Sequence, residues 1–150
     1  MVQRLSDRCN PAPLCARMGA FSRKHSMPNP AITESSITQL VDTFYARVRD
    51  DAVLGPVFEA KLAGHWHEHM PRMVAFWTKI LLGTGEFQGN VYGTHMALSG
   101  IATEHFVRWL TLFRLSAIEV FGTEGAAEPI QVAQRIASSL QLGFFGDIRV

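Results

Sequence analysis

Apolar residues recur at helical spacing, every three or four positions, through most of the chain after residue 33. The first such stripe consists of Ile37, Leu40, Val41, Phe44, Tyr45 and Val48. Thr33 precedes it as a suitable N-cap, and Glu34 places a negative charge in the first turn, where the helix dipole favours one. The spacing therefore predicts a long amphipathic helix that ends near residues 50–51.

A second helix is predicted over about residues 66–82, after a short turn formed by Leu54-Gly55-Pro56-Val57-Phe58. Its apolar stripe consists of His69, Met73, Phe76, Trp77, Ile80 and Leu81. Pro71 is expected in the first turn of this helix or at a bend, because a proline in a helix interior costs about 3 kcal/mol. Three glycines at 83, 85 and 89 then predict a loop, and a short helix follows at about 91–98.

Two further long helices complete the pattern. Thr103 is predicted as the N-cap of one, and Pro129 suits the first position of the other. Their stripes are Phe106, Trp109, Leu110, Phe113, Ala117, Val120 and Phe121, and then Ile130, Ala133, Ile136, Ala137, Leu140 and Phe144. No segment alternates convincingly as a strand would. The chain is therefore predicted to be all-α, with four long helices and two or three short pieces.

Residues 1–30 lack this periodicity and are rich in Pro, Ser, Arg and Asn. They are predicted to be a flexible N-terminal extension to a single folded domain at 31–150. Two alternatives stay open for them: translation that begins at Met18 or Met27, and a transit peptide, although no amphipathic helix is evident.

Composition narrows the class of protein. Apolar residues make up 47% of the chain and charged residues 18%, which indicates a well-filled globular interior. The net charge of +1 favours neither nucleic acid nor an anionic membrane as a partner. No apolar run reaches transmembrane length, and no secretory signal is evident. Because Cys9 and Cys15 both lie in the extension, no disulfide framework is expected. A soluble cytoplasmic protein is the expectation.

The histidines are the polar residues of this sequence to consider first as metal ligands. The segment His65-Trp66-His67-Glu68-His69 matches H-x-x-E-H, in which two histidines bind zinc and the glutamate acts as general base. Gly64 and Pro71 place the segment at a helix start, and a third protein ligand is not evident, so a zinc hydrolase is a minor alternative. His25 lies in the extension, and His105 is expected to be a surface or capping residue.

His95 stands apart, in a short predicted helix between two long aromatic-rich ones. Neutral imidazole is the usual proximal ligand of haem iron in oxygen-binding proteins. A haem is a flat apolar disc that needs a slot between helices, and apolar walls are offered by Phe58, Met73, Phe76 and Trp77. The same stripes are interrupted by three residues with polar groups, Tyr45, His69 and Trp109. A bound diatomic ligand needs hydrogen-bond donors of this kind. Tyr and Trp seldom bury their polar ends without a partner.

At these residues the chain resembles the group III truncated haemoglobins over about residues 35–142. The resemblance rests on four segments: Phe44-Tyr45-x-x-Val48-Arg49, Leu54-Gly55-Pro56-Val57-Phe58, Trp66-x-x-His69 running on to Phe76-Trp77 and Leu81-Leu82-Gly83, and Trp109-Leu110-x-Leu112-Phe113. His95 stands where the family has its proximal histidine. Two features depart from the family pattern: the long N-terminal extension, and Pro71 two residues after His69.

The resemblance implies a truncated globin fold, a two-over-two helical sandwich with an almost missing first helix. It implies that His95 binds the iron of haem b, that Tyr45 and Trp109 donate hydrogen bonds to the bound ligand, and that His69 gates the distal side. By the same resemblance Phe58 packs on the haem plane, and Met73 lies over it. Arg72 is a weaker candidate partner for a haem propionate.

Two donors on one ligand are expected to slow its release, which suits redox chemistry better than bulk transport. Expected reactions are nitric oxide dioxygenation and peroxidase-like turnover, with diatomic gases as ligands and an electron-donating reductase as partner. The alternatives are a non-enzymatic oxygen binder, acting as a sensor or store, the zinc hydrolase, and a helical interaction module without a cofactor.

Overall fold

The structure is a computed structural model, and it describes residues 31–148. Six helices follow one another in this part of the chain: α1 (Glu34–Asp50), α2 (Leu54–Leu62), α3 (Trp66–Leu82), α4 (Val91–Met96), α5 (Thr103–Gly125) and α6 (Ala127–Phe145). No strand occurs between residues 31 and 148. The predicted all-α architecture is confirmed. The predicted extension at 1–30, with Cys9, Cys15 and His25, lies outside the described residues, as do residues 149–150.

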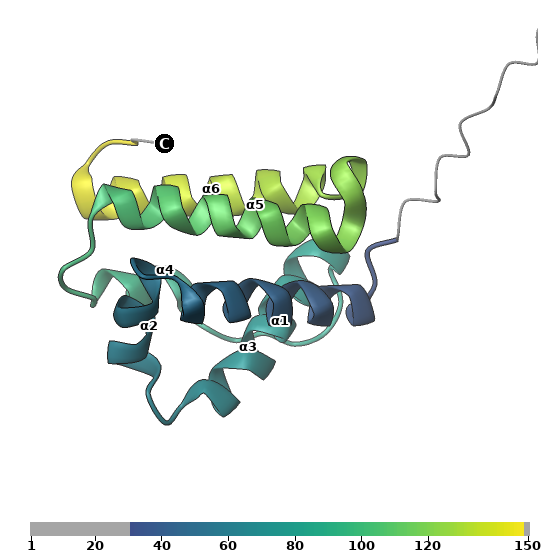
Figure 1. Ribbon diagram of the computed structural model, residues 1–150, viewed down its shortest axis with the longest axis horizontal. Helices are drawn as coiled ribbons and strands as arrows, with labels where there is room; N and C mark the ends of the chain where they lie inside the picture. The colour runs from purple at the N-terminus through teal and green to yellow at the C-terminus, as the bar shows by residue number, and fades with distance from the viewer. Residues whose placement is uncertain (1–30, 149–150) are drawn as a thin grey trace, which may run out of the picture.

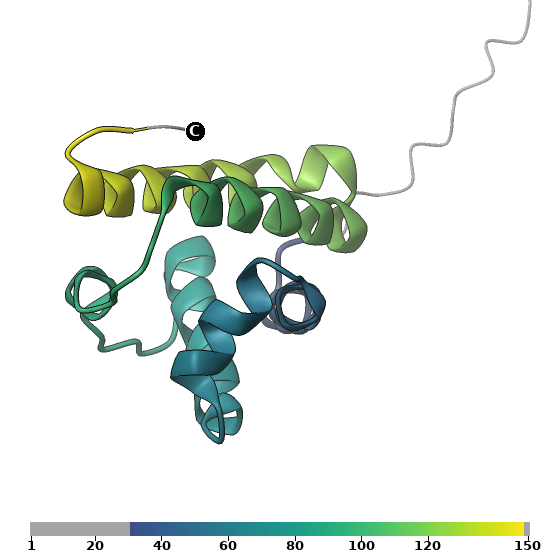
Figure 2. The same ribbon diagram turned by 60° about the vertical axis from the view of Figure 1, so that its left-hand side comes forward.

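The four long helices form two layers (Figures 1 and 2). In one layer α5 and α6 run side by side, and in the other α1 packs against α3. The layers meet where α1 contacts α5. The short helices flank this sandwich, with α2 contacting α1 and α5, and α4 packing against α6. The predicted two-over-two arrangement is therefore the observed one.

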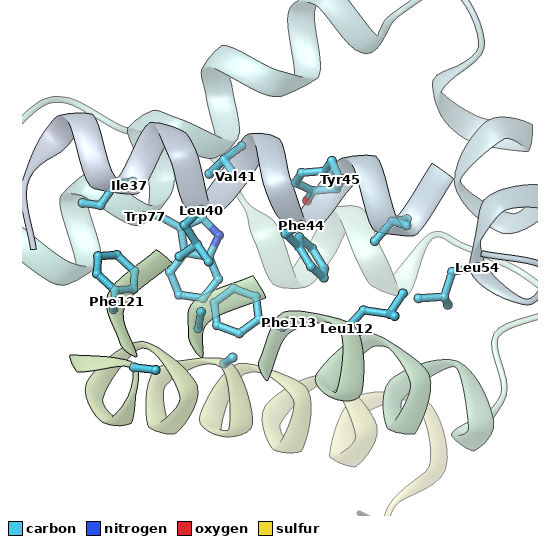
Figure 3. Close-up of a cluster of buried hydrophobic side chains, with 14 residues drawn as sticks. Ile37, Leu40, Val41, Phe44, Tyr45, Leu54, Trp77, Leu112, Phe113 and Phe121 are labelled. Carbon is cyan, nitrogen blue, oxygen red and sulfur yellow. The ribbon is translucent and has the colours of Figure 1, made fainter. Parts of the chain in front are cut away.

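The first helix is capped and buried as its sequence predicts. The Thr33 hydroxyl accepts a hydrogen bond from the Ser36 backbone N–H at 3.1 Å, and the Thr33 N–H donates to the Ser36 hydroxyl at 2.8 Å. This reciprocal pair satisfies donors that a helix start leaves free. The predicted apolar stripe of α1 is fully buried and forms the centre of the core shown in Figure 3.

The prediction of a turn at 54–58 is wrong, because this segment begins α2. The Asp51 carboxylate accepts hydrogen bonds from the backbone N–H groups of Val53 and Leu54, at 3.1 and 2.9 Å. These bonds start the helix from a residue outside it. Pro56 lies in the first turn of α2, where a missing N–H costs nothing. The Gly-Pro pair therefore misled a prediction that treated it as a helix breaker.

A close approach of backbones explains the glycine in this corner. A Cβ built on Gly55 would lie 2.8 Å from the carbonyl oxygen of Arg49, so α2 passes the end of α1 with no room for a side chain. The Arg108 side chain of α5 donates from Nε to the second oxygen of Asp51 at 2.7 Å. Asp51 thus joins the start of α2 to α5, and this fixes the position of Phe58 on α2.

The second long helix, α3, has the predicted bounds and ends at Gly83, which has a left-handed backbone (φ 69°). Pro71 lies inside α3, beyond its first turn, so of the two places expected for this proline the first turn is excluded. The short helix α4 has Asn90 as its N-cap, and the side-chain oxygen of Asn90 accepts from the Gly93 N–H at 2.8 Å.

The starts of α5 and α6 differ from prediction by one or two positions. Thr103 is the first residue of α5, and Ala102 is its N-cap. Since alanine has no capping oxygen, His105 closes the turn: its Nδ1 accepts from the Ala102 N–H at 3.0 Å, which confirms the predicted capping role. Pro129 lies in the first turn of α6 but not at its first position. No helix within residues 31–148 is long and apolar enough to cross a membrane.

Candidate functional site

One cavity of about 400 Å³ lies among α1, α2, α3, α4, α5 and α6. This volume is within the range of small-molecule and cofactor sites. All nine residues selected from the sequence line it: Tyr45, Phe58, His69, Arg72, Met73, Phe76, Trp77, His95 and Trp109. Residues far apart in the sequence are therefore brought together as the resemblance implied.

The His95 ring is held in one tautomer by its own helix. Its Nδ1 lies 2.7 Å from the carbonyl oxygen of Val91, one turn earlier in α4. A carbonyl only accepts hydrogen bonds, so Nδ1 carries the proton and Nε2 keeps a free lone pair. Histidines that bind metals almost always donate their other ring N–H in this way. His95 is thus prepared to act as a ligand through Nε2.

The position of α4 depends on Gly143 of α6. A Cβ built on Gly143 would lie 2.5 Å from the Tyr92 hydroxyl oxygen and 2.7 Å from the Met96 sulfur. A side chain at position 143 would therefore require the ends of the Tyr92 and Met96 side chains to shift. Since α4 packs against α6, this contact is close to the helix that carries His95.

Tyr45 enters the cavity from the opposite side, on α1, with 5% of its surface exposed. Burial raises the pKa of its hydroxyl far above the ordinary value, so the group stays a neutral hydrogen-bond donor. Its ring meets the ring of His69 edge-on, with centroids 5.1 Å apart, and that of Phe58 at 6.0 Å. Tyr45 and His69 therefore belong to one side of the site.

His69, on α3, has an unusual ring nitrogen. Its Nε2 is buried and has no hydrogen-bond partner within residues 31–148. Burial lowers the pKa of His69, and the positive charge of Arg72 lowers it further. The imidazole is therefore neutral at physiological pH. A buried polar atom without a partner indicates a place where a further group binds.

Trp109, on α5, completes the polar part of the cavity. Its ring stacks on Phe113, with centroids 5.5 Å apart and planes 17° from parallel, and Phe44 meets it edge-on at 5.5 Å. These contacts fix the indole in the core. Within residues 31–148, neither its N–H nor the Tyr45 hydroxyl donates a hydrogen bond. Both donors are thus available to a molecule in the cavity.

The rest of the lining is mostly apolar. Phe58, Met73, Phe76 and Trp77 form walls as predicted, whereas Arg72 is an exposed residue at the edge. The sequence analysis missed a second apolar wall, on the α4 side, formed by Ile101, Phe106, Ile136, Ala137, Leu140 and Phe144. Most of these residues were recognised as helix stripes, but nothing in the spacing separates a stripe that packs on protein from one that lines a cavity.

The zinc-like segment does not assemble a metal site. Its His65 and His67 side chains are exposed, and each lies 3.5 Å from a Glu68 carboxylate oxygen. His65, Glu68 and His69 line the cavity, whereas His67 does not. No group of three His, Cys, Asp or Glu side chains within residues 31–148 is arranged to hold a metal ion. The zinc alternative thus lacks a ligand set in this part of the chain.

Comparison with known proteins decides the family. No family model matches the chain. A group 3 truncated haemoglobin of Campylobacter jejuni is 36% identical over 113 residues, which cover 73% of this chain and 89% of that protein. The chain belongs to the group III truncated haemoglobins. The crystal structure of a group III truncated haemoglobin from Campylobacter jejuni matches with a TM-score of 0.72 and 36% identity, over 75% of this chain and 91% of that one.

The cavity of this truncated haemoglobin suits a haem group, the cofactor of the family. An imidazole with a free Nε2 lies on α4, a buried imidazole nitrogen without a partner lies on α3, and apolar side chains line both walls. Haem needs both an axial ligand for its iron and an apolar pocket for its ring. The donor set and the lining therefore fit the group.

Proposed function

We propose that this truncated haemoglobin holds haem b with His95 as the iron ligand, and that it binds diatomic gases for redox chemistry of oxygen, nitric oxide or peroxide. The proposal depends above all on the bond from His95 Nδ1 to the Val91 carbonyl, which leaves Nε2 free for iron. Haem supplies, when bound, an iron that takes a gas ligand and exchanges electrons.

The polar side of the cavity supports the choice of ligand. Tyr45 and Trp109 present an O–H and an N–H to the same space, and a diatomic ligand placed there accepts from both. Hydrogen bonds to a charged acceptor contribute about 1.5–3 kcal/mol each. Two such bonds slow ligand release by about two to three orders of magnitude, at 1.4 kcal/mol per tenfold. A transport protein has to release its cargo, so this arrangement favours a reaction over transport.

The remaining residues orient the cofactor and exclude water. Phe58, Phe76 and Trp77 supply flat rings, and Met73 adapts to the space between them. Arg72 at the edge of the cavity is the proposed partner of a haem propionate, because a guanidinium pairs well with a carboxylate. Its exposure makes this contact worth little for affinity.

The leading reaction is nitric oxide dioxygenation, in which one nitric oxide, one dioxygen and one electron give one nitrate. Tyr45 and Trp109 retain the oxygen until nitric oxide arrives. The electron comes from a reductase, which is the proposed partner. The alternative is a non-enzymatic oxygen binder, acting as a sensor or store.

The first experiment tests the cofactor. Purified full-length protein is loaded with hemin, reduced and exposed to carbon monoxide, and its absorption spectrum is recorded. His67→Ala is the matched control, because His67 is exposed and does not line the cavity. We expect this control to bind hemin as the wild type does and His95→Ala to lose the normal spectrum. A normal spectrum and stoichiometry in His95→Ala would show that the ligand assignment is wrong.

The second experiment tests the reaction. Oxygen-saturated reduced protein is mixed with nitric oxide, and nitrate is measured. We expect one nitrate per protein in a single turnover, and less than this in Tyr45→Phe. Fast oxygen release without nitrate would favour the oxygen binder instead.

A further inference from the structure

The start of α3, which carries His69, lacks two of the bonds that usually hold a helix start. The helix follows Gly64, which has a left-handed backbone (φ 77°), and its N-cap residue His65 makes no side-chain capping bond. Pro71 lacks an N–H, so the regular helix bond to the carbonyl of His67 cannot form. The N–H groups of Glu68 and His69 do donate to the His65 carbonyl oxygen, at 3.1 and 3.0 Å. Contacts of side chains with other helices therefore add to the hold on this turn.

Trp66, the first residue of α3, supplies these contacts. Its indole N–H donates to a Glu59 carboxylate oxygen of α2 at 2.9 Å. The Arg49 guanidinium at the end of α1 lies over its ring, 4.6 Å from the centroid. A carboxylate at the N–H edge and a cation on the ring face are both favourable to an indole. Glu59, Trp66 and Arg49, hereafter the Trp66 clamp, tie the start of α3 to α1 and α2.

The same ring also touches the residues of the polar side of the cavity. It meets His69 edge-on with centroids 6.0 Å apart, and Tyr45 likewise at 6.0 Å. It also lies nearly parallel to the ring of Phe58, at 6.5 Å. One side of Trp66 is therefore bound by charged groups near the surface, and another contacts the imidazole of His69, which lines the cavity.

We propose that Trp66 is a positioning residue that sets the access of gas to the cavity through His69. With the Trp66 clamp formed, the first turn of α3 stays in place and His69 blocks the entrance. When the clamp is broken, the turn detaches more often and a diatomic ligand enters faster. This inference rests on the proposed function, because it takes the cavity to be the gas-binding site.

An ordinary packing role for Trp66 predicts something different. A residue that only supports the fold changes ligand entry by loosening the whole cavity, whether or not His69 is present. A positioning residue changes entry only while His69 is there to be positioned. A double-mutant cycle between positions 66 and 69 separates the two roles.

The test uses the full-length hemin-loaded protein, reduced, with carbon monoxide as the probe. Association rates are measured after flash photolysis. We expect Trp66→Phe, which removes the N–H but keeps a ring, to raise the rate by about fivefold, the effect of losing one modest hydrogen bond. Glu59→Ala breaks the same bond from the surface and is expected to raise the rate by about threefold.

Two comparisons make the result decisive. In a His69→Ala background, Trp66→Phe is expected to change the rate by less than about 1.5-fold, because interaction terms vanish when one partner is absent. Glu104→Ala removes an exposed acid at the start of α5 that takes no part in the Trp66 clamp, and it is expected to leave the rate unchanged.

The inference is overturned if Trp66→Phe has the same effect with and without His69, or if neither Trp66→Phe nor Glu59→Ala raises the rate. The failure of the proposed function looks different, since wild-type protein that takes up no hemin, or binds no carbon monoxide after reduction, yields no rate at all. That outcome overturns both.

Discussion

On the α3 side, the cavity is backed by the main core of the protein, whereas on the α4 side it is bounded by a six-residue helix with no buried residue. Behind the first wall, Phe113 stacks between Trp77 and Trp109, and Phe44 meets two of these rings edge-on. The second wall contains a smaller buried cluster, formed by Phe106, Ala137 and Leu140.

The difference indicates how the two sides obtain their shape. The aromatic wall is formed by the hydrophobic effect and by ring contacts that need no cofactor. Helix α4 is too short to be stable by itself, so its position is expected to depend on its packing against α6 and on the cofactor that His95 is proposed to bind. We therefore expect the α3 wall to be rigid without a ligand and the α4 wall to take its final position when the ligand binds. The following substitutions test this asymmetry.

Phe113→Ala is expected to have the largest effect. The side chain is 1% exposed and stacks on two tryptophans, so its removal leaves a cavity in the main core. We expect a loss of about 3–5 kcal/mol in the free energy of unfolding, with or without hemin. Urea denaturation measures it. Phe144→Ala, in the half-buried α4 wall, is the matched control, and an equal loss there would contradict the asymmetry.

Tyr45→Phe tests whether the rigid wall donates a hydrogen bond to the bound ligand. Loss of the hydroxyl is expected to speed oxygen dissociation by about ten- to a hundredfold, the equivalent of about 1.5–3 kcal/mol. Stopped-flow displacement by carbon monoxide gives the rate. Tyr92 is the other tyrosine of the chain and does not line the cavity, so Tyr92→Phe is expected to change the rate by less than about twofold. Equal effects of the two variants would refute the role of Tyr45.

Gly143→Leu tests the α4 wall. The new side chain occupies the space of the Tyr92 hydroxyl and the Met96 sulfur, so the contact of α4 with α6 has to rearrange. We expect hemin to dissociate about tenfold faster, a change of about 1.4 kcal/mol. Transfer of hemin to an excess of an acceptor globin measures this rate. Ser139→Leu, at an exposed position of α6, is the matched control. Equally fast hemin loss in this variant would show that the effect does not come from the α4 contact.

Asp51→Asn has the smallest expected effect and a characteristic pH dependence. The hydrogen bond from Arg108, followed by that from the Leu54 N–H, lowers the pKa of the Asp51 carboxyl. A lowered pKa in the folded state stabilises the protein above the ordinary value of about 3.9, and this stability is lost as the pH falls through the lower, native pKa. We expect Asp51→Asn to cost about 1 kcal/mol at pH 7 and progressively less below pH 4. Urea denaturation at several pH values checks this, and a cost that does not shrink in acid would exclude the charge as its cause.

The sequence was sufficient for the architecture and for nine of the residues that line the cavity, but not for the second apolar wall. Periodicity located α1 and α3 almost to the residue, because their stripes are long and their ends carry Thr33 and Gly83. It failed at α2, since the cap that starts this helix is Asp51, which also binds Arg108 from another layer. Pairings between distant residues of this kind leave no local pattern.

The same limit applies to the site. The resemblance suggested the roles of Tyr45 and His95. The bond from His95 to Val91 and the approach of Gly143 to Tyr92 could be recognised only in the three-dimensional structure. Gly143 illustrates the reason, because a glycine within a predicted helix reads as a weak position until its neighbour in space is known. The Trp66 clamp likewise joins residues of three helices.

Resonance Raman spectroscopy of the reduced, ligand-free protein tests the central claim most directly, because the iron–histidine stretching band reports the proximal bond itself. The wild type is expected to show this band, and His95→Gly is expected to lack it. Added imidazole should restore the band in the variant by entering the space left by the side chain. A band that persists in His95→Gly without imidazole would contradict the assignment of His95 as the iron ligand.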